Sequence, residues 1–331
     1  MKTAVVILNW NGEKLFRQFF PTLDRYTINT DIYVIDNNSN DNSIKYVESN
    51  FPRFNLILLD KNYGFAEGYN RGLSQINADL YCLLNSDVEV TENWIKPVVD
   101  IFINNKNISI AQPIILDLNK KNFFEYAGAA GGFIDSLGYP YCRGRIFDHI
   151  EKNIGQYNNN EKIFWASGAC FFIRKDVWDK LGGFDNDFFA HFEEIDLCWR
   201  AFNQNYKAIS VGNSKIFHLG GGTLPNSSLK WFLNYRNSLI LLTKNLPTNR
   251  LLNVLFIRLI MDIISSVQFI FKGNFSTFKS IIRANISFYS RFKYYFKKRY
   301  FFNTNNKYWS IKSIVWNYYI KNQKTFKDNS Q

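Results

Sequence analysis

Short apolar runs alternate with segments of helical spacing in the first part of the chain. The runs occupy residues 4–8, 31–35, 55–59, 80–84 and 108–115, and β-branched and other apolar residues in such short runs favour strands. Between the first two runs, Leu15, Phe19 and Leu23 recur at the spacing of one helix face, and a similar pattern begins at Ser43. Strands that alternate with helices predict parallel βαβ units, so residues 1–115 are expected to form a doubly wound α/β half.

The pattern loosens over residues 117–163, which are rich in Asn, Gly, Lys and Tyr and include AGAAGGF and GQYNNNEK. These turn-forming residues predict a loop-rich insertion with short strands. The next segment, FWASGACFFIRKDVWDKLGGFD, indicates a strand followed by a helix. A helix start at FFAHFEEIDLCWRAF and another strand at AISVGNSKIFHLGGG complete this part.

From Leu229 onward the chain consists of long helical stretches, so we predict one part at 1–228 and a helical appendage at 229–331. Residues 251–271 are apolar but carry Arg258 and Asp262, which shortens the uninterrupted run below the roughly 20 residues that a spanning helix needs. We expect a helix that lies in the plane of a membrane. A helix that spans the membrane is the alternative. For the basic, aromatic tail as a whole, the alternative is a solvated helical face with its aromatic rings packed on the rest of the protein.

The whole chain has a net charge of +12, and the excess of positive charge lies in the C-terminal part, from residue 250 onward. Residues 250–331 carry 15 Lys and Arg against two Asp, whereas residues 1–249 carry 25 basic and 26 acidic side chains. The segment RFKYYFKKRYFF also interleaves cations with aromatic rings. This pattern is typical of proteins that contact an anionic membrane surface.

The four cysteines indicate neither a zinc site nor a disulfide framework. Cys82, Cys142, Cys170 and Cys198 are far apart and form no C-x-x-C pair. The chain opens into the apolar run TAVVILNW without the features of a secretion signal. Both observations favour a reducing, cytoplasmic location.

Three acidic clusters are predicted to meet at one edge of the sheet. Asp36 and Asp87 each follow a short apolar run, and the third cluster extends from Glu193 to Asp196. In an open α/β sheet, ligands bind outside the carboxyl ends of the parallel strands. Asp36 could contact a ribose or a base, although a simple turn at the end of a strand is the other interpretation.

Asn85 and Asp87 are candidates for a metal site. Alternate residues at a strand end point to the same side, so two oxygen-bearing side chains would face the same ligand. Mg²⁺ and Mn²⁺ prefer oxygen ligands and often bind with one or two carboxylates and a substrate diphosphate. His218, which ends a strand before LGGG, is a further candidate ligand. A polar turn and a structural histidine are the alternatives.

Glu193, Glu194 and Asp196 are the candidate catalytic residues. In a helix Glu193 and Asp196 share one face at i,i+3 while Glu194 points elsewhere, so the group could divide between a base and a positioning residue. Crowded carboxylates raise at least one pKa, which suits a general base. An exposed acidic helix start is the alternative.

These pieces together resemble family 2 inverting glycosyltransferases of the GT-A fold, and most closely the rhamnosyltransferase-like branch. The resemblance extends over residues 4–223 and is carried by VVILNWNG, VIDNNSNDNS, NYGFAEGYNRG, LLNSDVEV, SGACFFIRKDVWDKLGGFD, FFAHFEEIDLCWR and FHLGGGT. It implies a Rossmann-like, mostly parallel sheet. It further implies a nucleotide-binding half at 1–115 and an acceptor-binding half at 116–228.

The resemblance also implies roles for single residues. The nucleotide and donor pocket would be formed by Asn9, Asn11, Asp36, Asn62, Gly64, Asn70, Asn85, Trp165 and Gly168, with Ser167 beside them. Tyr235, Arg236 and Asn237 resemble a segment near the diphosphate. A buried tryptophan and a packing glycine are the structural alternatives at 165 and 168.

Two positions depart from the family pattern. Asp87 stands at the last position of the DxD-type metal motif, and Asn85 replaces the first acidic residue, which lowers the charge of the metal site. Glu194 replaces the aspartate of the E-D pair that acts as the base on the acceptor hydroxyl. A glutamate reaches one methylene further, so Glu193 and Glu194 both stay candidates for the base.

The implied reaction moves a sugar, rhamnose among the candidates, from a nucleotide-diphosphate donor with inversion and with Mg²⁺ or Mn²⁺. A saccharide or a polyprenyl-diphosphate-linked saccharide would be the acceptor in cell-surface polysaccharide biosynthesis. The basic appendage would hold the enzyme on the inner face of the cell membrane. A nucleic-acid-binding protein and a non-catalytic sugar-nucleotide-binding protein are the alternatives, although no nucleic acid is expected. An NAD-dependent dehydrogenase is disfavoured because G-x-G-x-x-G is absent after the first strand.

Overall fold

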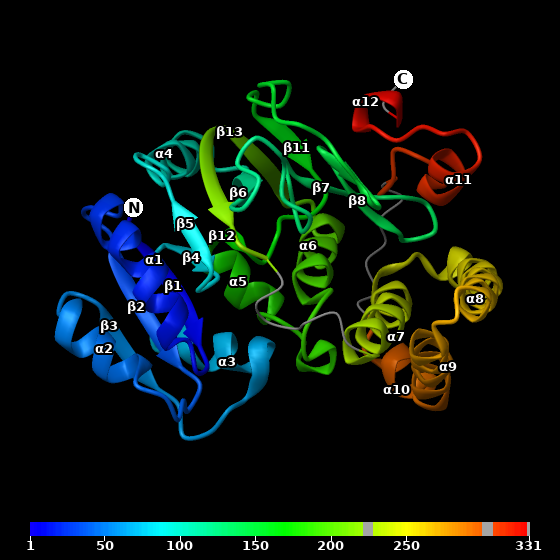
Figure 1. Cartoon of the computed structure of the whole chain (residues 1–331), viewed down its shortest axis with the longest axis horizontal. Helices are drawn as coiled ribbons and strands as arrows, with labels where there is room; N and C mark the ends of the chain where they lie inside the picture. Colours follow the sequence, from blue (N-terminus) through cyan, green and yellow to red (C-terminus); the bar gives the residue numbers. More distant parts are fainter. Residues whose placement is uncertain (221–227, 300–306, 330–331) are drawn as a thin grey trace.

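The computed structural model describes residues 1–220, 228–299 and 307–329. Its first part confirms the predicted alternation of strands and helices (Figure 1). The strands are β1 (Thr3–Asn9), β2 (Asp31–Asp36), β3 (Asn55–Leu58) and β4 (Leu80–Leu84), and the helices are α1 (Glu13–Tyr26), α2 (Ser43–Asn50) and α3 (Gly64–Leu73). β1 lies between β2 and β4, and β3 is next to β2, all in parallel. The carboxyl ends of these strands therefore share one edge.

The sheet continues beyond β4 with strands of mixed direction. Its order is β11-β13-β6-β12-β4-β1-β2-β3, and β5 pairs with β13. The added strands are β5 (Val88–Val90), β6 (Ile108–Asp117), β11 (Glu161–Ile163), β12 (Cys170–Arg174) and β13 (Lys207–His218). β12 runs antiparallel to both β4 and β6, whereas β13 is parallel to β6. The result is the expected α/β fold with an antiparallel strand at its centre.

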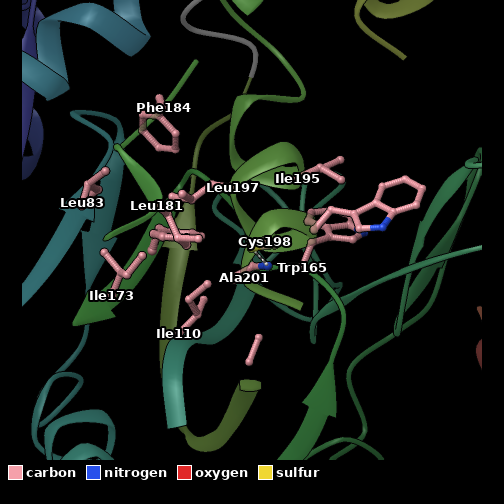
Figure 2. Close-up of a cluster of buried hydrophobic side chains, with 14 of the residues drawn as sticks. Leu83, Ile110, Trp165, Ile173, Leu181, Phe184, Ile195, Leu197, Cys198 and Ala201 are labelled. Atoms are coloured by element: carbon pink, nitrogen blue, oxygen red, sulfur yellow. Dashed lines mark hydrogen bonds between the residues drawn. The ribbon is translucent and has the colours of Figure 1, made fainter. Parts of the chain in front are cut away.

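Helices cover both faces of this sheet because the strands are apolar on both sides. One face packs against α1, α2 and α4 (Lys96–Asn104), where Phe16, Phe20 and Phe102 are buried. The other face packs against α3, α5 (Lys175–Leu181) and α6 (Glu193–Asn203). Figure 2 shows Leu83 and Ile173 of the strands on the same side as Leu197 of α6. This second core supports the start of α6.

The insertion at 117–163 contains the short antiparallel strands that its composition predicts. They are β7 (Gly132–Ile134), β8 (Pro140–Cys142), β9 (Arg145–Ile146) and β10 (His149–Ile150). The C-terminal helices α11 (Ile314–Tyr319) and α12 (Phe326–Asn329) lie over this small sheet (Figure 1). Asp135 fixes the contact by accepting a hydrogen bond from the Ile314 backbone at 2.9 Å.

The helical region consists of α7 (Ser228–Asn245), α8 (Thr248–Phe271), α9 (Phe275–Ser290) and α10 (Phe292–Lys297). Its buried side chains belong to the same core cluster as α6, with Leu239, Leu255 and Phe288 among them. Arg299 donates to the backbone carbonyl of Leu246 at 2.5 Å. The predicted boundary at residue 228 therefore crosses one continuous hydrophobic core. The different functions predicted for the parts on either side of it stay predictions.

Candidate active site

The first polar cluster organises the strand ends. The amide of Asn9 on β1 donates to the Asp36 carboxylate on β2 at 2.8 Å, and Asp36 also accepts from the Ser39 backbone and hydroxyl. Asp36 is only 4% exposed. Its contacts are those of the turn that the sequence left open as an alternative. Asn11 adopts a left-handed φ of 55° and accepts from the Asn40 backbone at 2.7 Å.

The NYGFAEGYNRG segment likewise uses its polar groups internally. Asn62 accepts from the Gly64 backbone at 2.8 Å, and Gly64 has a φ of 77°, which glycine adopts without strain. Asn70 both donates to and accepts from the Phe184 backbone, at 2.9 and 3.0 Å. Asn37, which the sequence analysis did not select, holds this segment by donating to the Gly64 carbonyl. These side chains shape the ends of β2 and α3.

A cavity of about 370 Å³ lies at the edge where β4, β6 and β13 end. Four of the predicted groups line it, namely Asn85 with Asp87, Gly168, the Glu193–Glu194 pair and His218. Its remaining wall is formed by Phe65, Asp117, Glu125, Tyr126, Ala127, Ser167, Ala169, Ala190, His191, Leu219, Gly220 and Lys230. The predicted residues Asn9, Asn11, Asp36, Asn62, Gly64, Asn70, Trp165 and Asp196 are not part of this wall. Two of the three acidic clusters thus meet in one cavity.

Asp87 and His218 face each other across paired strands. His218 is opposite Val88 in the β13–β5 ladder, which brings its Nε2 to 3.1 Å from Asp87 Oδ1. On the other side, His218 Nδ1 lies 3.4 Å from Glu125 Oε1. Burial alone would lower the pKa of His218, but the Asp87 and Glu125 carboxylates raise it to about 10. No sequence pattern points to Glu125, because it lies in an irregular segment after β6.

The two glutamates at the start of α6 point one oxygen each into buried space. Glu193 Oε2 and Glu194 Oε2 are inaccessible and have no hydrogen-bond partner among the described residues. Burial raises the pKa of Glu194 to about 7. Burial, followed by the neighbouring Glu194 charge, raises the pKa of Glu193 well above its usual range. With its pKa of about 7, the Glu194 carboxyl group can accept or release a proton near neutral pH.

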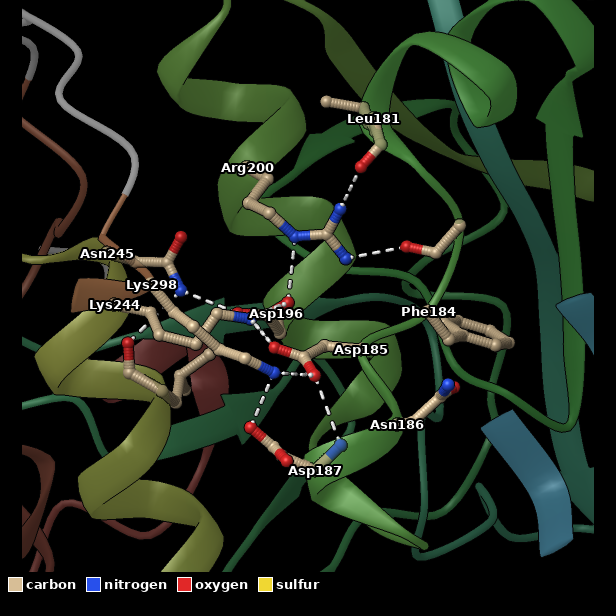
Figure 3. A network of polar contacts seen from close by, with 12 residues as sticks. Leu181, Phe184, Asp185, Asn186, Asp187, Asp196, Arg200, Lys244, Asn245 and Lys298 are labelled. Atoms are coloured by element: carbon tan, nitrogen blue, oxygen red, sulfur yellow. Dashed lines mark hydrogen bonds and ion pairs between the residues drawn. The ribbon is translucent and has the colours of Figure 1, made fainter. Parts of the chain in front are cut away.

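Asp196 has a different environment from the two glutamates. It is fully buried and accepts from Arg200, Lys244 and Asn245, each at 2.8 Å (Figure 3). Lys244 also contacts Asp185 at 2.7 Å. The shared face expected for Glu193 and Asp196 does not place Asp196 in the cavity, because the network turns its carboxylate toward α7. Asp196 joins two helices.

Trp165 and Gly168 differ in their surroundings: the tryptophan is buried in the core, whereas the glycine lines the cavity. Trp165 is 3% exposed, and its indole donates to the Phe133 carbonyl at 2.8 Å. A side chain at Gly132 would lie 2.0 Å from its ring, so the tryptophan packs on that glycine. Gly168 lines the cavity and has no atom within 4 Å of an added Cβ. Trp165 is thus a core residue, and Gly168 leaves open space in the cavity.

Tyr235, Arg236 and Asn237 lie on α7 beside the segment that precedes α6. The Asn237 amide donates to the carbonyls of Phe188, Ala190 and His191. The Tyr235 hydroxyl lies 2.6 Å from that of Ser265 on α8. None of the three lines the cavity. The last residues of the FHLGGGT motif, 221–223, lie outside the described residues.

Comparison with known proteins agrees with the fold. The sequence profile of Glycosyl transferase family 2 matches residues 4–182. The Low-salt glycan biosynthesis hexosyltransferase Agl10 of Haloferax volcanii is 23% identical over 251 residues, which are 71% of this chain and 73% of that protein. The dTDP-rhamnosyl transferase RfbF of Shigella flexneri is 22% identical over 229 residues, which are 65% of this chain and 71% of that protein.

Solved structures share the fold at low sequence identity. The crystal structure of GalNAc-T7 with UDP, GalNAc and Mn²⁺ superposes with a TM-score of 0.54 at 17% identity, over 66% of this chain and 43% of that one. S. aureus TarS 1-349 superposes with a TM-score of 0.51 at 13% identity, over 88% of this chain and 73% of that one. The family profile spans more than half of the chain, so this protein belongs to glycosyl transferase family 2 and is a glycosyltransferase.

Proposed function

We propose that this glycosyltransferase moves a sugar from a nucleotide-diphosphate donor to a saccharide, free or lipid-linked, with inversion, in the biosynthesis of a cell-surface polysaccharide. The cavity that joins Asp87 and His218 to Glu193 and Glu194 carries the proposal. Support comes from relatives named as a hexosyltransferase of glycan biosynthesis and a dTDP-rhamnosyl transferase. Rhamnose is the donor sugar that we propose to test first.

A divalent cation fits one wall of the cavity, although the protein supplies few ligands for it. Within residues 1–220, 228–299 and 307–329, no group of three or more His, Cys, Asp or Glu side chains is arranged to hold a metal ion. Asp87 offers a carboxylate oxygen, and Asn85 lines the same wall. His218 Nε2 lies 3.1 Å from that carboxylate, but because the carboxylates raise the pKa of His218 to about 10, the ring would have to lose its proton before it could bind the ion. Mg²⁺ or Mn²⁺ would take its other ligands from the donor diphosphate and water. The bound ion would offset the charge of the departing nucleoside diphosphate.

Glu194 is the proposed general base. It would accept the proton of the acceptor hydroxyl as that oxygen attacks the anomeric carbon, and attack opposite the leaving group inverts the configuration. Its Oε2 is buried without a partner, and its pKa of about 7 suits this task at neutral pH. Glu193 shares the cavity, and burial together with the Glu194 charge raises its pKa, so Glu193 is expected to stay protonated while Glu194 acts as the base.

A donor screen tests this function. The full-length protein is incubated with TDP-rhamnose, UDP-sugars and GDP-sugars, with a saccharide acceptor, in the presence of Mn²⁺ or after chelation. We expect one donor to release nucleoside diphosphate in a metal-dependent way and to give a product of inverted anomeric configuration. A retained configuration, or donor binding without turnover of any donor, would contradict the proposal.

We further propose that α8 rests on an anionic membrane that holds the acceptor. By length and composition, α8 is the one helix in the described part of the chain that could cross a membrane. However, the charged side chains Arg258 and Asp262 face the protein. They are 3% and 2% exposed, and Arg258 donates to the Leu137 carbonyl and to the Ser238 hydroxyl. Asp262 accepts from Asn285 of α9 at 3.1 Å. A helix fixed in this way is suited to lie along a surface.

The opposite side of α8 is apolar and open to solvent. Its exposed apolar side chains are Leu252, Phe256, Ile257, Ile260, Ile263, Ile264, Val267, Ile270 and Phe271. Contiguous apolar patches of this kind mark interaction sites. The same helical region carries the exposed cations Lys272, Lys279, Arg283, Lys293 and Lys297. Apolar contact with the lipid chains and attraction to anionic headgroups would act together.

Vesicle sedimentation tests the membrane contact. The variant Phe256→Ser/Ile264→Ser/Phe271→Ser should bind phosphatidylglycerol vesicles at least about tenfold more weakly than the unaltered protein, because each exposed ring or branched chain contributes roughly 1.5–3 kcal/mol when buried. Ile28→Ser, at an exposed apolar position after α1, is the control. Unchanged sedimentation of the triple variant would refute the contact. Salt-sensitive binding of an oligonucleotide in place of vesicles would favour the nucleic-acid interpretation.

A further inference from the structure

The turn that leads into α6 has an unfavourable backbone conformation. Phe189, His191 and Phe192 are not glycines, yet their φ angles are 62°, 67° and 74°. Left-handed angles are rare for bulky residues, and they persist only where surrounding contacts hold them. Three of them within four residues form an unusual concentration. The turn therefore needs a fixed external support.

This turn delivers the chemically important side chains to the cavity. His191, Glu193 and Glu194 all line it, and each has one buried polar atom that finds no partner within the described part of the chain. Phe192 stands at the N-terminus of α6, so its backbone angles set the direction in which Glu193 and Glu194 leave the helix. A small change of these angles would move both carboxylates.

Asn237 on α7 provides the support. It is fully buried, and its Nδ2 donates to the carbonyls of Phe188, Ala190 and His191 at 2.8, 2.9 and 2.8 Å. Three carbonyls thus converge on one amide group. An aspartate would present an acceptor to these acceptors, and a leucine would leave them without a donor.

Arg236 fixes the orientation of that amide. Its Nε and Nη2 donate to Asn237 Oδ1 at 3.0 and 2.8 Å, and Nη2 also donates to the Asp187 carbonyl at 3.0 Å. Because the oxygen of Asn237 is occupied by the guanidinium, its NH₂ group must face the turn. The pair also binds the segment before the turn. Arg236 and Asn237 therefore act as one clamp, here called the α7 clamp.

We propose that Asn237 is a positioning residue for sugar transfer. It holds the 188–192 turn in its left-handed conformation and so places Glu194 against the acceptor hydroxyl, without contacting either substrate. The inference rests on the proposed function of Glu194 as the base. It replaces the expectation that this segment lies at the donor diphosphate, since Asn237 does not line the cavity.

The test compares Asn237→Ala with Asn285→Ala in the full-length protein. Asn285 is a partly buried asparagine in α9 that donates to Asp262 and touches no residue of the turn, so it controls for general loss of an amide in the helical region. We expect Asn237→Ala to lower kcat at least about tenfold while the Kd of the donor changes less than twofold. Asn285→Ala should keep kcat within twofold.

The pH profile separates positioning from a merely structural effect. Burial raises the pKa of Glu194, so a turn released toward water should move the acid limb of kcat/KM to lower pH in Asn237→Ala, whereas Asn285→Ala should keep the limb of the unaltered protein. If Asn237→Ala does not fold, the same kcat, donor Kd and pH profile are measured on Arg236→Lys. This variant keeps the positive charge but loses the two-pronged contact with Asn237.

The outcomes are distinct. An unchanged kcat in the clamp variant, or a donor Kd that weakens in proportion to the loss of rate, would overturn the positioning role. Absence of transfer by the unaltered protein with every donor would instead overturn the proposed function. A reduced kcat with intact donor binding and a shifted acid limb supports the inference.

Discussion

Glu193 and Glu194 are adjacent in sequence but are coupled by their shared burial. Each has an oxygen that is inaccessible and unpaired, and the charge of either one raises the cost of ionising the other. Proton uptake is therefore spread over the pair, and one glutamate is expected to stay protonated when the other is the base. Either glutamate could then remove the proton of the acceptor hydroxyl, and single substitutions distinguish them.

Substitution of the base should reduce turnover and spare the donor. We expect Glu194→Gln to lower kcat at least about a hundredfold, because a positioned base contributes roughly 10²–10⁴ in rate. Glu193→Gln keeps the base and should be less damaging. Donor Kd, measured by calorimetry, should stay close to that of the unaltered protein in both. An inactive Glu193→Gln beside an active Glu194→Gln would reverse the assignment.

The same assignment predicts the direction of the pH dependence. Glu194 acts as a base only when ionised, and burial raises its pKa to about 7. Therefore kcat/KM should rise as the pH increases through about 7, and at pH 6 it should be about tenfold below its plateau. Other groups near Glu194 are Glu193 and the thiols of Cys142 and Cys198. Burial raises the pKa values of the two thiols, which therefore stay neutral in this range. A flat profile between pH 5.5 and 8 would exclude Glu194.

At the scale of elements, α6 is joined to α7 by buried charges rather than by apolar contact alone. Asp196 pairs with Arg200 of its own helix and with Lys244 of α7. Burial would raise the pKa of Asp196, but the Lys244 and Arg200 charges lower it below its usual range. A carboxylate with a lowered pKa stabilises the folded protein above the unfolded pKa of about 3.9, and this contribution is lost as the pH falls.

Removal of one partner should leave uncompensated buried charge. Asp196→Ala is expected to lower the free energy of unfolding by about 3–5 kcal/mol, as broken buried pairs do. Asp100→Ala removes an exposed i,i+4 pair with Lys96 on α4 and should change it by at most about 0.5 kcal/mol. Urea unfolding at pH 7 measures both. Equal stability of the two variants would show that the Asp196 network contributes little.

At the scale of the whole molecule, the helical region is part of the structure that builds the active site. α7 supports the turn before α6, and α8 to α10 share the core cluster of the sheet. The outward side of α8 is mostly apolar, while its charged side chains Arg258 and Asp262 are buried. The proposed attachment to a membrane and the proposed support of the active site would therefore use opposite sides of the same group of helices.

Substitutions of two leucines of α8 should distinguish its buried side from its exposed side. Leu255 is 5% exposed and Leu252 is 72% exposed. Leu255→Ala should lower the free energy of unfolding by about 2–5 kcal/mol, because it leaves a cavity in the core. Leu252→Ala should change it by no more than about 0.5 kcal/mol and should weaken vesicle binding instead. Similar losses of stability in both variants would mean that the outward side of α8 is buried in solution.

Although the three-residue strand β5 is not predicted, the apolar pattern of the sequence predicts β1 to β4, β6 and the helices α1 and α2, because each strand is a short apolar run and each helix has a periodic buried face. It also placed Asp87 and His218 at strand ends, where alternation and strand length fix the side on which a residue lies. Only the tertiary structure decided that Glu125 reaches His218, that Asp196 faces α7, and that Asn237 holds the turn before Glu193. These contacts join segments that are distant in sequence, and their geometry depends on how helices pack, which local periodicity does not specify.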